Sequence, residues 1–363
     1  MHFSPAQDRA LEQVARWLAD PGQPQVFRLF GYAGTGKTTL ARHLAEHVEG
    51  EVAFGAYTGK AALVMRSKGC RDARTIHSMI YRPKDTQGDA PTFVLNEDSP
   101  AAKASLIVID ECSMVDEEMG RDLLSFGKKT LVLGDPAQLP PIQGGGFFTE
   151  AEPDAMLTEV HRQAADDPIV RLSMEVREGR RLSRGAYGRS RIIAKGEIDA
   201  AAVTASDQIL VGLNRTRRGY NRRMRELLGF SGDAPNAGEK LVCLRNNRAK
   251  GLLNGGLFRV EKANGMRRGK ISLSVKPEDL GSAKPMRVRV LPAFFAGEED
   301  IPYALRRESD EFDYGYALTV HKAQGSQWND VVLFDESFAF REHRARWLYT
   351  GITRAAERLT IVM

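Results

Sequence analysis

The amino-acid sequence predicts an α/β protein with two lobes, each built on a parallel sheet that is covered by helices. Short apolar runs bounded by turn residues alternate with helical patterns along most of the chain, and this alternation is typical of doubly wound folds. At 363 residues the chain is longer than most single domains. The expected strands also outnumber those that one sheet usually holds, which favours two lobes over one.

The first expected element is a helix over residues 5–19, where Ala10, Val14, Trp17 and Leu18 recur at helical spacing after a Ser-Pro start. Seven apolar runs then predict buried strands because they are short and end at turn residues. These runs span residues 26–30, 52–56, 106–109, 131–133, 209–213, 331–334 and 359–362.

Two segments depart from this alternation. Residues 81–104 are polar, contain Pro and Gly and surround a strand-like TFVL, which predicts a β-hairpin insertion. The stretches LVCLRN, LFRVEKA, KISLSV and RVRVLPAF lack long helices between them and predict a small barrel. The expected division is a first lobe over 1–84 and 104–155 with the hairpin over 85–103, and a second lobe over 156–238 and 311–363 with the barrel over 239–310.

Composition favours a folded protein with a phosphate-bearing partner. Hydrophobic residues make up 42% and charged residues 27% of the chain, and the net charge is +5. The three cysteines, Cys70, Cys112 and Cys243, form no CxxC or Cys/His cluster, so neither a disulfide framework nor a zinc site is indicated. No apolar run approaches about 20 residues and the N-terminus lacks the pattern of a signal peptide. We expect a soluble cytoplasmic protein that does not bind membranes.

The strongest local signal is GYAGTGKT at residues 31–38, which satisfies GxxxxGK[ST] between an expected strand and an expected helix. Glycines allow the backbone N–H groups to curl around phosphate, and the helix N-terminus adds partial positive charge. Lys37 is expected to reach the β- and γ-phosphates of ATP, while Thr38 helps to hold Mg²⁺. The expected nucleotide-binding residues are Gly34, Thr35, Gly36, Lys37, Thr38 and Thr39.

Two further segments carry residues suited to phosphate chemistry. The run at 106–109 ends in Asp110 and Glu111, where a P-loop enzyme places a magnesium-binding carboxylate. We expect Asp110 to hold Mg²⁺ and Glu111 to orient or deprotonate the attacking water. Gln138 in GDPAQLPP is a candidate contact of the γ-phosphate, although the same turn could be a simple surface turn.

Eight blocks taken in order resemble the superfamily 1 helicases, and within them the branch that contains RecD-like proteins and the phage helicase Dda. The blocks are GYAGTGKTT (31–39), AYTGKAA (56–62), TIHSMI (75–80), VIDECSMV (108–115), LVLGDPAQLPPI (131–142), LTEVHRQ (157–163), YALTVHKAQGSQWNDVVLF (316–334) and LYTGITRAAERLTIV (348–362). The resemblance spans nearly the whole chain. It implies two RecA-like lobes, a hairpin that acts as a separation pin, and an SH3-like barrel.

The resemblance also implies roles for residues that have no signal of their own. Gln7 falls in the segment that reads adenine, and Arg162 and Arg354 match arginine fingers of the second lobe. A guanidinium stabilises the charge that develops on the transferred phosphoryl group. Phe93 is the expected tip or support of the pin, with an inward-facing structural role as the alternative.

Residues matching the strand-binding channel of the family are Thr58, Lys60, His77, Thr319, His321 and Lys322, with Gln324 beside them. Their hydroxyl, amide and basic groups suit phosphate contacts that do not depend on base sequence. Trp328 and Tyr349 also lie in these blocks, but aromatic residues there are more often core residues than base platforms.

The implied activity is ATP-driven movement from 5′ to 3′ on single-stranded and forked DNA by a monomer, with nucleotide hydrolysed between the lobes. Two alternatives stay open at this stage. One is an RNA-directed helicase of the same superfamily, since phosphate contacts barely register the 2′-OH. The other is a P-loop ATPase that a strand stimulates but that unwinds nothing.

Overall fold

The chain was analysed as a computed structural model, which describes residues 3–83, 93–140, 146–159, 167–247, 250, 252–278, 284–298 and 300–363. Contacts between Cα atoms divide the chain into two compact units. Unit 1 comprises Met1–Thr86, Pro91–Leu182 and Ala345–Thr353, while unit 2 contains Ser183–Arg344 and Arg354–Met363.

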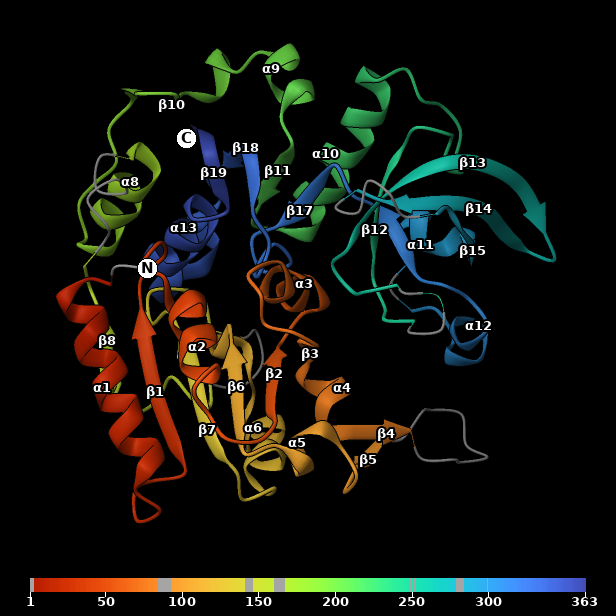
Figure 1. Ribbon diagram of the computed structural model, residues 1–363. Helices are drawn as coiled ribbons and strands as arrows, with labels where there is room; N and C mark the ends of the chain where they lie inside the picture. The colour runs from red at the N-terminus through yellow and green to blue at the C-terminus, as the bar shows by residue number, and fades with distance from the viewer. Residues whose placement is uncertain are drawn as a thin grey trace. The chain divides into compact units, whose positions relative to one another are not determined.

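Unit 1 is built on a six-stranded parallel sheet in the order β3-β2-β6-β7-β1-β8 (Figure 1). Its strands are β1 (Val26–Gly31), β2 (Val52–Ala56), β3 (Arg74–Thr75), β6 (Leu106–Asp110), β7 (Lys129–Gly134) and β8 (Ala155–Leu157). Four of them coincide with the expected runs 26–30, 52–56, 106–109 and 131–133, which confirms these predictions. The order places the carboxyl ends of β1, β7 and β6 next to one another.

Helices cover both faces of this sheet. The described helices of unit 1 are α1 (Pro5–Ala19), α2 (Lys37–Ala45), α3 (Gly59–Ser67), α4 (Ile76–Ile80), α5 (Pro100–Lys103), η1 (Cys112–Met114), α6 (Glu117–Leu124), α8 (Pro168–Arg177) and α13 (Arg344–Ile352). The apolar sides of α1, α2 and α3 pack on one face, against residues such as Leu106 and Val108 of β6. The helices α4, α5 and α6 pack on the other face, against Ile107 and Ile109. Because successive strand residues point to opposite faces, a strand buried on both sides is a continuous apolar run.

Helix starts in unit 1 are set by local capping. The side chain of Ser4 accepts a hydrogen bond from Gln7 N while Gln7 Oε1 accepts one from Ser4 N, which forms a capping box at α1. Thr58 and Thr75 cap α3 and α4 in the same way as single N-cap residues. The helix expected over residues 5–19 is therefore confirmed, including its boundaries.

Unit 2 contains a second six-stranded sheet, in the order β17-β11-β18-β19-β10-β9. Its strands are β9 (Gly185–Tyr187), β10 (Ser190–Ile193), β11 (Gln208–Val211), β17 (Ala317–Thr319), β18 (Trp328–Phe334) and β19 (Ala355–Val362). All pairs are parallel except β9 with β10. The described helical segments here are η2 (Lys195–Glu197), α9 (Ala200–Ala205), α10 (Asn214–Leu227) and η4 (Ser337–His343). The expected strand at 209–213 is confirmed but ends at Val211, and those at 331–334 and 359–362 are parts of longer strands.

A five-stranded antiparallel sheet follows in the same unit, in the order β15-β14-β13-β12-β16 (Figure 1). It comprises β12 (Lys240–Cys243), β13 (Leu257–Arg267), β14 (Lys270–Pro277), β15 (Met286–Val290) and β16 (Phe312–Tyr314), with the short helices α11 (Pro292–Ala296) and α12 (Tyr303–Arg307). An isolated bridge between Val290 and Asp310 connects the far edges, so the sheet curls. The strand-rich insertion is therefore present, but its last strand lies beyond residue 310, where the insertion was expected to end.

The two sheets of unit 2 share one hydrophobic core. Ile209 and Val211 of the parallel sheet belong to the same buried cluster as Leu241, Val260 and Val288 of the antiparallel sheet. The insertion is therefore packed onto its lobe as one folded body.

The segment expected to form a hairpin contains a two-stranded antiparallel ladder of β4 (Tyr81–Pro83) and β5 (Phe93–Leu95). The residues between these strands, 84–92, lie outside the described part of the chain. The expected extent of 85–103 is not matched at its end, because α5 already occupies Pro100–Lys103 and packs into the core of unit 1.

The boundary between the lobes also differs from the expected position at residue 155. Both α8 and α13 group with unit 1, although the second lobe was expected over residues 156–238 and 311–363; the last residues, Arg354–Met363, do belong to unit 2. The guanidinium of Arg177 on α8 lies 3.6 Å from the centre of the Tyr32 ring in the P-loop, which is a cation–π contact. These two helices therefore belong to unit 1 through their contacts, although they follow residue 155 in the sequence.

Within the residues that the structure describes, no helix is long and apolar enough to cross a membrane. Cys70, Cys112 and Cys243 are buried and free.

Candidate functional site

The P-loop between β1 and α2 has the backbone shape that phosphate binding needs. Gly34 and Gly36 have φ values of 79° and 80°, a left-handed conformation that side chains disfavour. A Cβ atom at Gly31 would lie 2.7 Å from Thr35 Oγ1 and 2.8 Å from Leu157 Cβ, so only glycine fits there. The loop is held by Thr35, whose hydroxyl donates to Tyr32 O at 2.8 Å. The three glycines thus allow the backbone shape of the loop, whereas the Thr35 hydrogen bond holds the loop in that shape.

Lys37 is the first residue of α2, and its ammonium group is folded over the loop. Lys37 Nζ donates to Gly31 O at 2.6 Å and to Tyr32 O at 3.0 Å. The charge therefore lies above the loop whose N–H groups face the phosphate position. Thr38 and Thr39 follow in the first turn of α2, with Thr38 buried and Thr39 half-buried.

The structure brings Thr38 and Asp110 together, although 72 residues separate them. Thr38 Oγ1 donates to Asp110 Oδ2 at 2.8 Å, and Asp110 Oδ1 accepts from Glu111 N at 2.8 Å. One hydroxyl and one carboxylate side by side suit Mg²⁺, which binds proteins through one or two oxygen ligands and completes its shell with water and phosphate. The two residues expected to hold the metal are therefore within hydrogen-bond distance of each other.

Glu111 has a strained backbone. Its φ of 54° and ψ of 43° place a residue with a long side chain in the left-handed region. Such conformations cost about 1 to 3 kcal/mol and are concentrated at functional sites. Its side chain is half-buried, at the turn from β6 into η1.

Gln7 connects α1 to the P-loop. Its side chain is buried, and Nε2 donates to Thr35 O at 3.0 Å while Oε1 closes the capping box at Ser4. The contact places the start of α1 beside the nucleotide loop, where the resemblance expects an adenine-reading residue.

The GDPAQ turn after β7 is ordered by Asp135. Asp135 Oδ1 accepts from Ala137 N at 3.0 Å, and Asp135 O accepts from Gln138 N at 3.1 Å. Gln138 is 7% exposed, and its side-chain oxygen has no hydrogen-bond partner among the described residues. Buried amide groups are rarely left unsatisfied, so the end of this side chain is suited to meet a ligand. The alternative of a plain surface turn does not fit a buried Asp135 and Gln138.

Tyr349 joins this site through its hydroxyl. The hydroxyl donates to Asp135 Oδ2 at 2.7 Å and accepts from Ala33 N at 3.0 Å, while the ring is 1% exposed. Burial, strengthened by the charge of Asp135, raises the pKa of Tyr349 well above its usual value, so the hydroxyl stays protonated and can donate. The next residue, Thr350, accepts a hydrogen bond at Oγ1 from Leu139 N at 2.9 Å. Helix α13 is thus bonded to both the P-loop and the GDPAQ turn.

The sequence pattern predicts that Tyr349 is a core residue. This prediction is correct for the ring, but it did not include the hydrogen bonds of the hydroxyl. The signal that could have indicated them is the presence of Tyr instead of Phe in the motif block, because a buried Tyr hydroxyl usually has a hydrogen-bond partner.

The two expected arginine fingers differ in what the structure describes. Arg354 lies in unit 2, is 5% exposed and donates from Nη1 to Ser326 O at 3.1 Å. Arg162 lies outside the described residues.

The residues of unit 1 that are expected to bind the strand have different surroundings: one caps a helix, one is buried and one contacts an aromatic ring. Thr58 caps α3 by accepting from Ala61 N at 3.1 Å, and the neighbouring Lys60 is only 6% exposed. His77 on α4 contacts Phe93 of β5 edge-to-face, with ring centroids 4.4 Å apart. Phe93 itself is 45% exposed. The structure therefore brings together His77 of α4 and Phe93, which pairs with Pro83 in the two-stranded ladder.

Their counterparts in unit 2 follow β17. Thr319 Oγ1 accepts from Lys322 N at 3.3 Å, and the His321 ring lies 5.3 Å from that of Phe340. Burial lowers the pKa of both His321 and Lys322; the nearby charges of His343 and Arg217 lower them further. Gln324 is buried.

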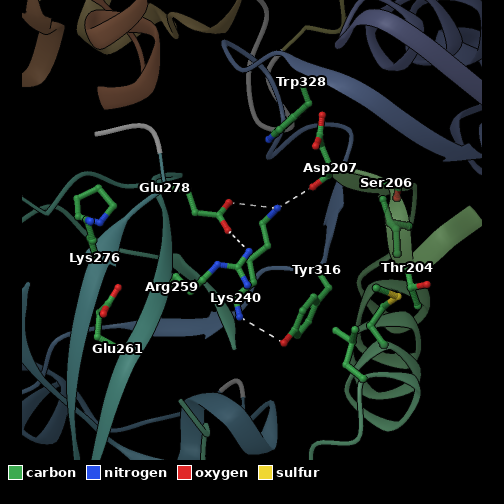
Figure 2. A pocket seen from close by; sticks show the side chains of 14 residues that line it. Thr204, Ser206, Asp207, Lys240, Arg259, Glu261, Lys276, Glu278, Tyr316 and Trp328 are labelled. Atoms are coloured by element: carbon green, nitrogen blue, oxygen red, sulfur yellow. Dashed lines mark hydrogen bonds and ion pairs between the residues drawn. The ribbon is translucent and has the colours of Figure 1, made fainter. Parts of the chain in front are cut away.

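A cavity of about 620 Å³ lies in unit 2 between the two sheets, and Trp328 is one of its lining residues. Figure 2 shows that Lys240, Arg259 and Glu278 converge there: Lys240 Nζ donates to Asp207 O at 2.7 Å, and Arg259 is paired with Glu278 at 2.7 Å. The two cations are thus already bonded within the fold. Trp328 is 9% exposed, as the core interpretation expects.

Comparison with known proteins agrees with this geometry. A model of the AAA domain family matches residues 2–197, and a model of the UvrD-like helicase C-terminal domain matches residues 314–362. The ATP-dependent RecD2 DNA helicase of Deinococcus radiodurans is 28% identical over 364 residues, which cover 91% of this chain and 46% of that protein. The ATP-dependent DNA helicase dda of Enterobacteria phage T4 is 31% identical over 165 residues, covering 41% of this chain and 37% of that protein.

Among solved structures, a Pif1 helicase from a study of unwinding at forked dsDNA has a TM-score of 0.61 at 16% identity and covers 99% of this chain and 92% of its own. This likeness shows a shared fold. The chain spans about half the length of the RecD2 relative. Because the AAA model covers more than half of the chain and the phosphate site is assembled as described, the chain belongs to the AAA-domain family of P-loop proteins, and its similarity to RecD2, to dda and to the UvrD-like C-terminal domain supports a helicase within superfamily 1.

Proposed function

We propose that this protein is an ATP-dependent DNA helicase that moves from 5′ to 3′ on single-stranded DNA. The observation that carries the proposal is the phosphate site of unit 1, where the P-loop, the Thr38–Asp110 pair and the unsatisfied Gln138 converge. A bound nucleotide explains why they meet.

In this proposal the residues of unit 1 divide the work on ATP. Lys37 and the N–H groups of the P-loop hold the phosphates, and Glu111 orients or deprotonates the attacking water. Thr38 and Asp110 would hold Mg²⁺, which neutralises charge on the phosphate oxygens when bound. Gln138 contacts the γ-phosphate, and its bond through Asp135 to Tyr349 connects that contact to α13.

Arg162 and Arg354 are proposed to supply guanidinium groups to the transferred phosphoryl group. Their assignment depends on the family resemblance alone. Gln7 is proposed to read the adenine end of the nucleotide, in keeping with its contact with Thr35.

DNA is the proposed track because relatives and neighbours are described with it. RecD2 and dda are named DNA helicases, and a Bacteroides Pif1 structure is described as bound to ssDNA. The strand is proposed to contact Thr58, Lys60 and His77 in unit 1 and Thr319, His321 and Lys322 in unit 2. Forked DNA is the proposed substrate for unwinding, with the β4–β5 ladder as the separation pin and the curled antiparallel sheet as the SH3-like element.

The phosphate site predicts that Lys37→Ala and Glu111→Gln each lower ATP turnover by at least about a hundredfold, since they remove phosphate contact and water activation. Glu111→Gln should keep its affinity for nucleotide because it leaves the P-loop unchanged. Turnover and binding of a fluorescent nucleotide measure the two effects. Lys68→Ala and Glu118→Gln alter exposed charges of the same unit and should match the wild type. Wild-type turnover in either site variant would refute the assignment.

The hydroxyl of Tyr349 predicts a second effect on turnover. Tyr349→Phe leaves Ala33 N–H and Asp135 without a shared partner, a loss of about 1 to 3 kcal/mol for buried groups. We expect kcat to fall about tenfold while the KM for ATP changes little, because the P-loop itself is retained. Steady-state kinetics at saturating DNA measure the split. Tyr220→Phe, which removes a half-buried hydroxyl in unit 2, is the matched control, and equal kcat values for the two variants would contradict the role.

Direction and track are tested with one set of substrates. Matched DNA and RNA duplexes carrying either a 5′ or a 3′ single-stranded tail are incubated with the protein and ATP, and strand displacement is followed. We expect displacement of the 5′-tailed DNA duplex. Displacement of only 3′-tailed substrates would overturn the direction, a preference for RNA would favour the RNA-directed alternative, and stimulated ATP turnover without displacement would favour a non-unwinding ATPase.

Phe93 is predicted to support the pin, since a ring nearly half exposed at the start of β5 can stack on the last base pair of a duplex. Phe93→Ala should reduce unwinding per ATP hydrolysed severalfold while single-strand-stimulated ATP turnover survives. The control is Phe338→Ala, which removes another exposed ring. If unwinding per ATP stays at the wild-type level, Phe93 only anchors the ladder to His77.

A further inference from the structure

The positive charge of the chain is concentrated on one helix of unit 2. The 14 residues of α10 contain six arginines and one glutamate, so its formal charge is 6 − 1 = +5. The whole chain has a net charge of +5, which leaves the rest of it neutral, 5 − 5 = 0. A local excess of this size is the electrostatic signature of a phosphate-binding surface.

Four of these arginines form a stripe along one side of the helix. Arg215, Arg218, Arg222 and Arg225 are spaced by three, four and three residues, which keeps them within one face of an α-helix. We call these four residues the arginine stripe. At about 1.5 Å per residue the stripe is roughly 15 Å long, enough to meet several phosphates of one strand.

The arginines of the stripe differ in whether they already make an ion pair within the fold. Arg225 is structural, because its Nε lies 2.7 Å from Glu239, a fully buried carboxylate, and its guanidinium lies 4.3 Å from the Tyr314 ring centre. Arg215 and Arg222 are exposed, and neither makes an ion pair within the described residues. These two charges are therefore available to a ligand.

The N-terminus of α10 does not contribute to this anion-attracting surface. Glu336 Oε2 accepts from Gly212 N at 2.7 Å and Leu213 N at 3.0 Å, and Oε1 accepts from Thr216 Oγ1 at 2.6 Å. A carboxylate thus already occupies the positive end of α10, which leaves the side of the helix as its anion-attracting surface.

A cavity of about 520 Å³ lies beside the stripe, between α10 and the antiparallel sheet. Arg218, Arg222 and Arg225 line one wall. The rest of the lining includes Phe295 and Tyr314, whose ring centroids are 5.1 Å apart, and the 59% exposed Met266. It also includes Asp233 and Asp313, of which Asp313 is paired with Arg217 at 2.7 Å. Arginines beside aromatic rings match a nucleotide chain with accessible bases, because a duplex keeps its bases stacked inside.

We propose that the arginine stripe and this cavity form a further binding site for single-stranded nucleic acid, with phosphates on the arginines and a base against Phe295. The site lies outside the motif blocks and depends on the proposed function only for the kind of ligand. It adjoins the proposed track, because Asn221 on the same helix donates from Nδ2 to Ala317 O of β17 at 3.1 Å.

The arginines are tested by the salt dependence of binding. Arg215→Ala/Arg222→Ala is compared with wild type for a fluorescent thymidine strand, by anisotropy without nucleotide over a range of salt concentrations. Each lost phosphate contact should lower the slope of log K against log salt by roughly 0.7, or about 1.4 for the pair. Arg181→Ala/Arg184→Ala removes the same charge from two exposed positions outside α10 and should keep the wild-type slope. Equal slopes for the two double variants would overturn the site.

The kind of ligand is tested with matched probes. A blunt duplex should show a smaller change of slope than the single strand, and an equal change would assign the stripe to duplex phosphates instead. Phe295→Leu keeps an apolar side chain but removes the ring. It should weaken binding of the thymidine strand about fivefold or more and leave binding of an abasic strand unchanged. Equal effects on both strands would refute the base contact.

These measurements use the full chain and need no hydrolysis. If the Lys37 and Glu111 variants showed that the ATPase assignment is wrong, the salt slopes would still report on the stripe. An unchanged slope together with normal stimulated hydrolysis would reject the stripe alone.

Discussion

The phosphate site depends on one constraint of the parallel sheet, which is that β6, β7 and β1 end side by side at the same edge. The register of β1 with β7 and of β6 with β7 puts the P-loop, Asp110 and the GDPAQ turn at that edge. Short polar connections can then meet across more than 70 residues of sequence, as the 2.8 Å hydrogen bond between Thr38 and Asp110 shows. Without this strand order, the same motifs would be separate loops with no common ligand.

Helix α13 contacts that site through hydrogen bonds. It comes from the last motif block, just before Arg354, yet its Tyr349 and Thr350 bind the loops of unit 1. The Tyr349 hydroxyl bonds to two loops of unit 1, at Ala33 of the P-loop and at Asp135 of the turn that holds Gln138. The last motif block is therefore joined by direct hydrogen bonds to both the P-loop and the GDPAQ turn.

Unit 2 shows how charge can be divided between stability and binding on a single helix. Arg225 neutralises the buried Glu239, and leaving that carboxylate unpaired would cost several kcal/mol. Arg215 and Arg222 on the same face have no such duty and stay exposed. The cations of the neighbouring cavity at Lys240 and Arg259 belong to the first kind, since they are bonded within the fold. Burial and pairing, more than the number of arginines, distinguish a structural cation from one that can bind a ligand.

The sequence by itself determined the α/β architecture and the position of the P-loop between β1 and α2. Buried parallel strands must be apolar on both faces, so their runs were visible at 26–30 and 106–109, and the P-loop glycines are required by a φ near 80° that other residues avoid. The tertiary structure alone decided which distant groups meet: that α8 and α13 join unit 1, that β16 extends the insertion past residue 310, and that His77 contacts Phe93. It also decided the role of the Tyr349 hydroxyl. Periodicity reports which side of an element is buried, whereas a hydrogen bond between residues more than 200 positions apart depends on packing, which no local pattern encodes.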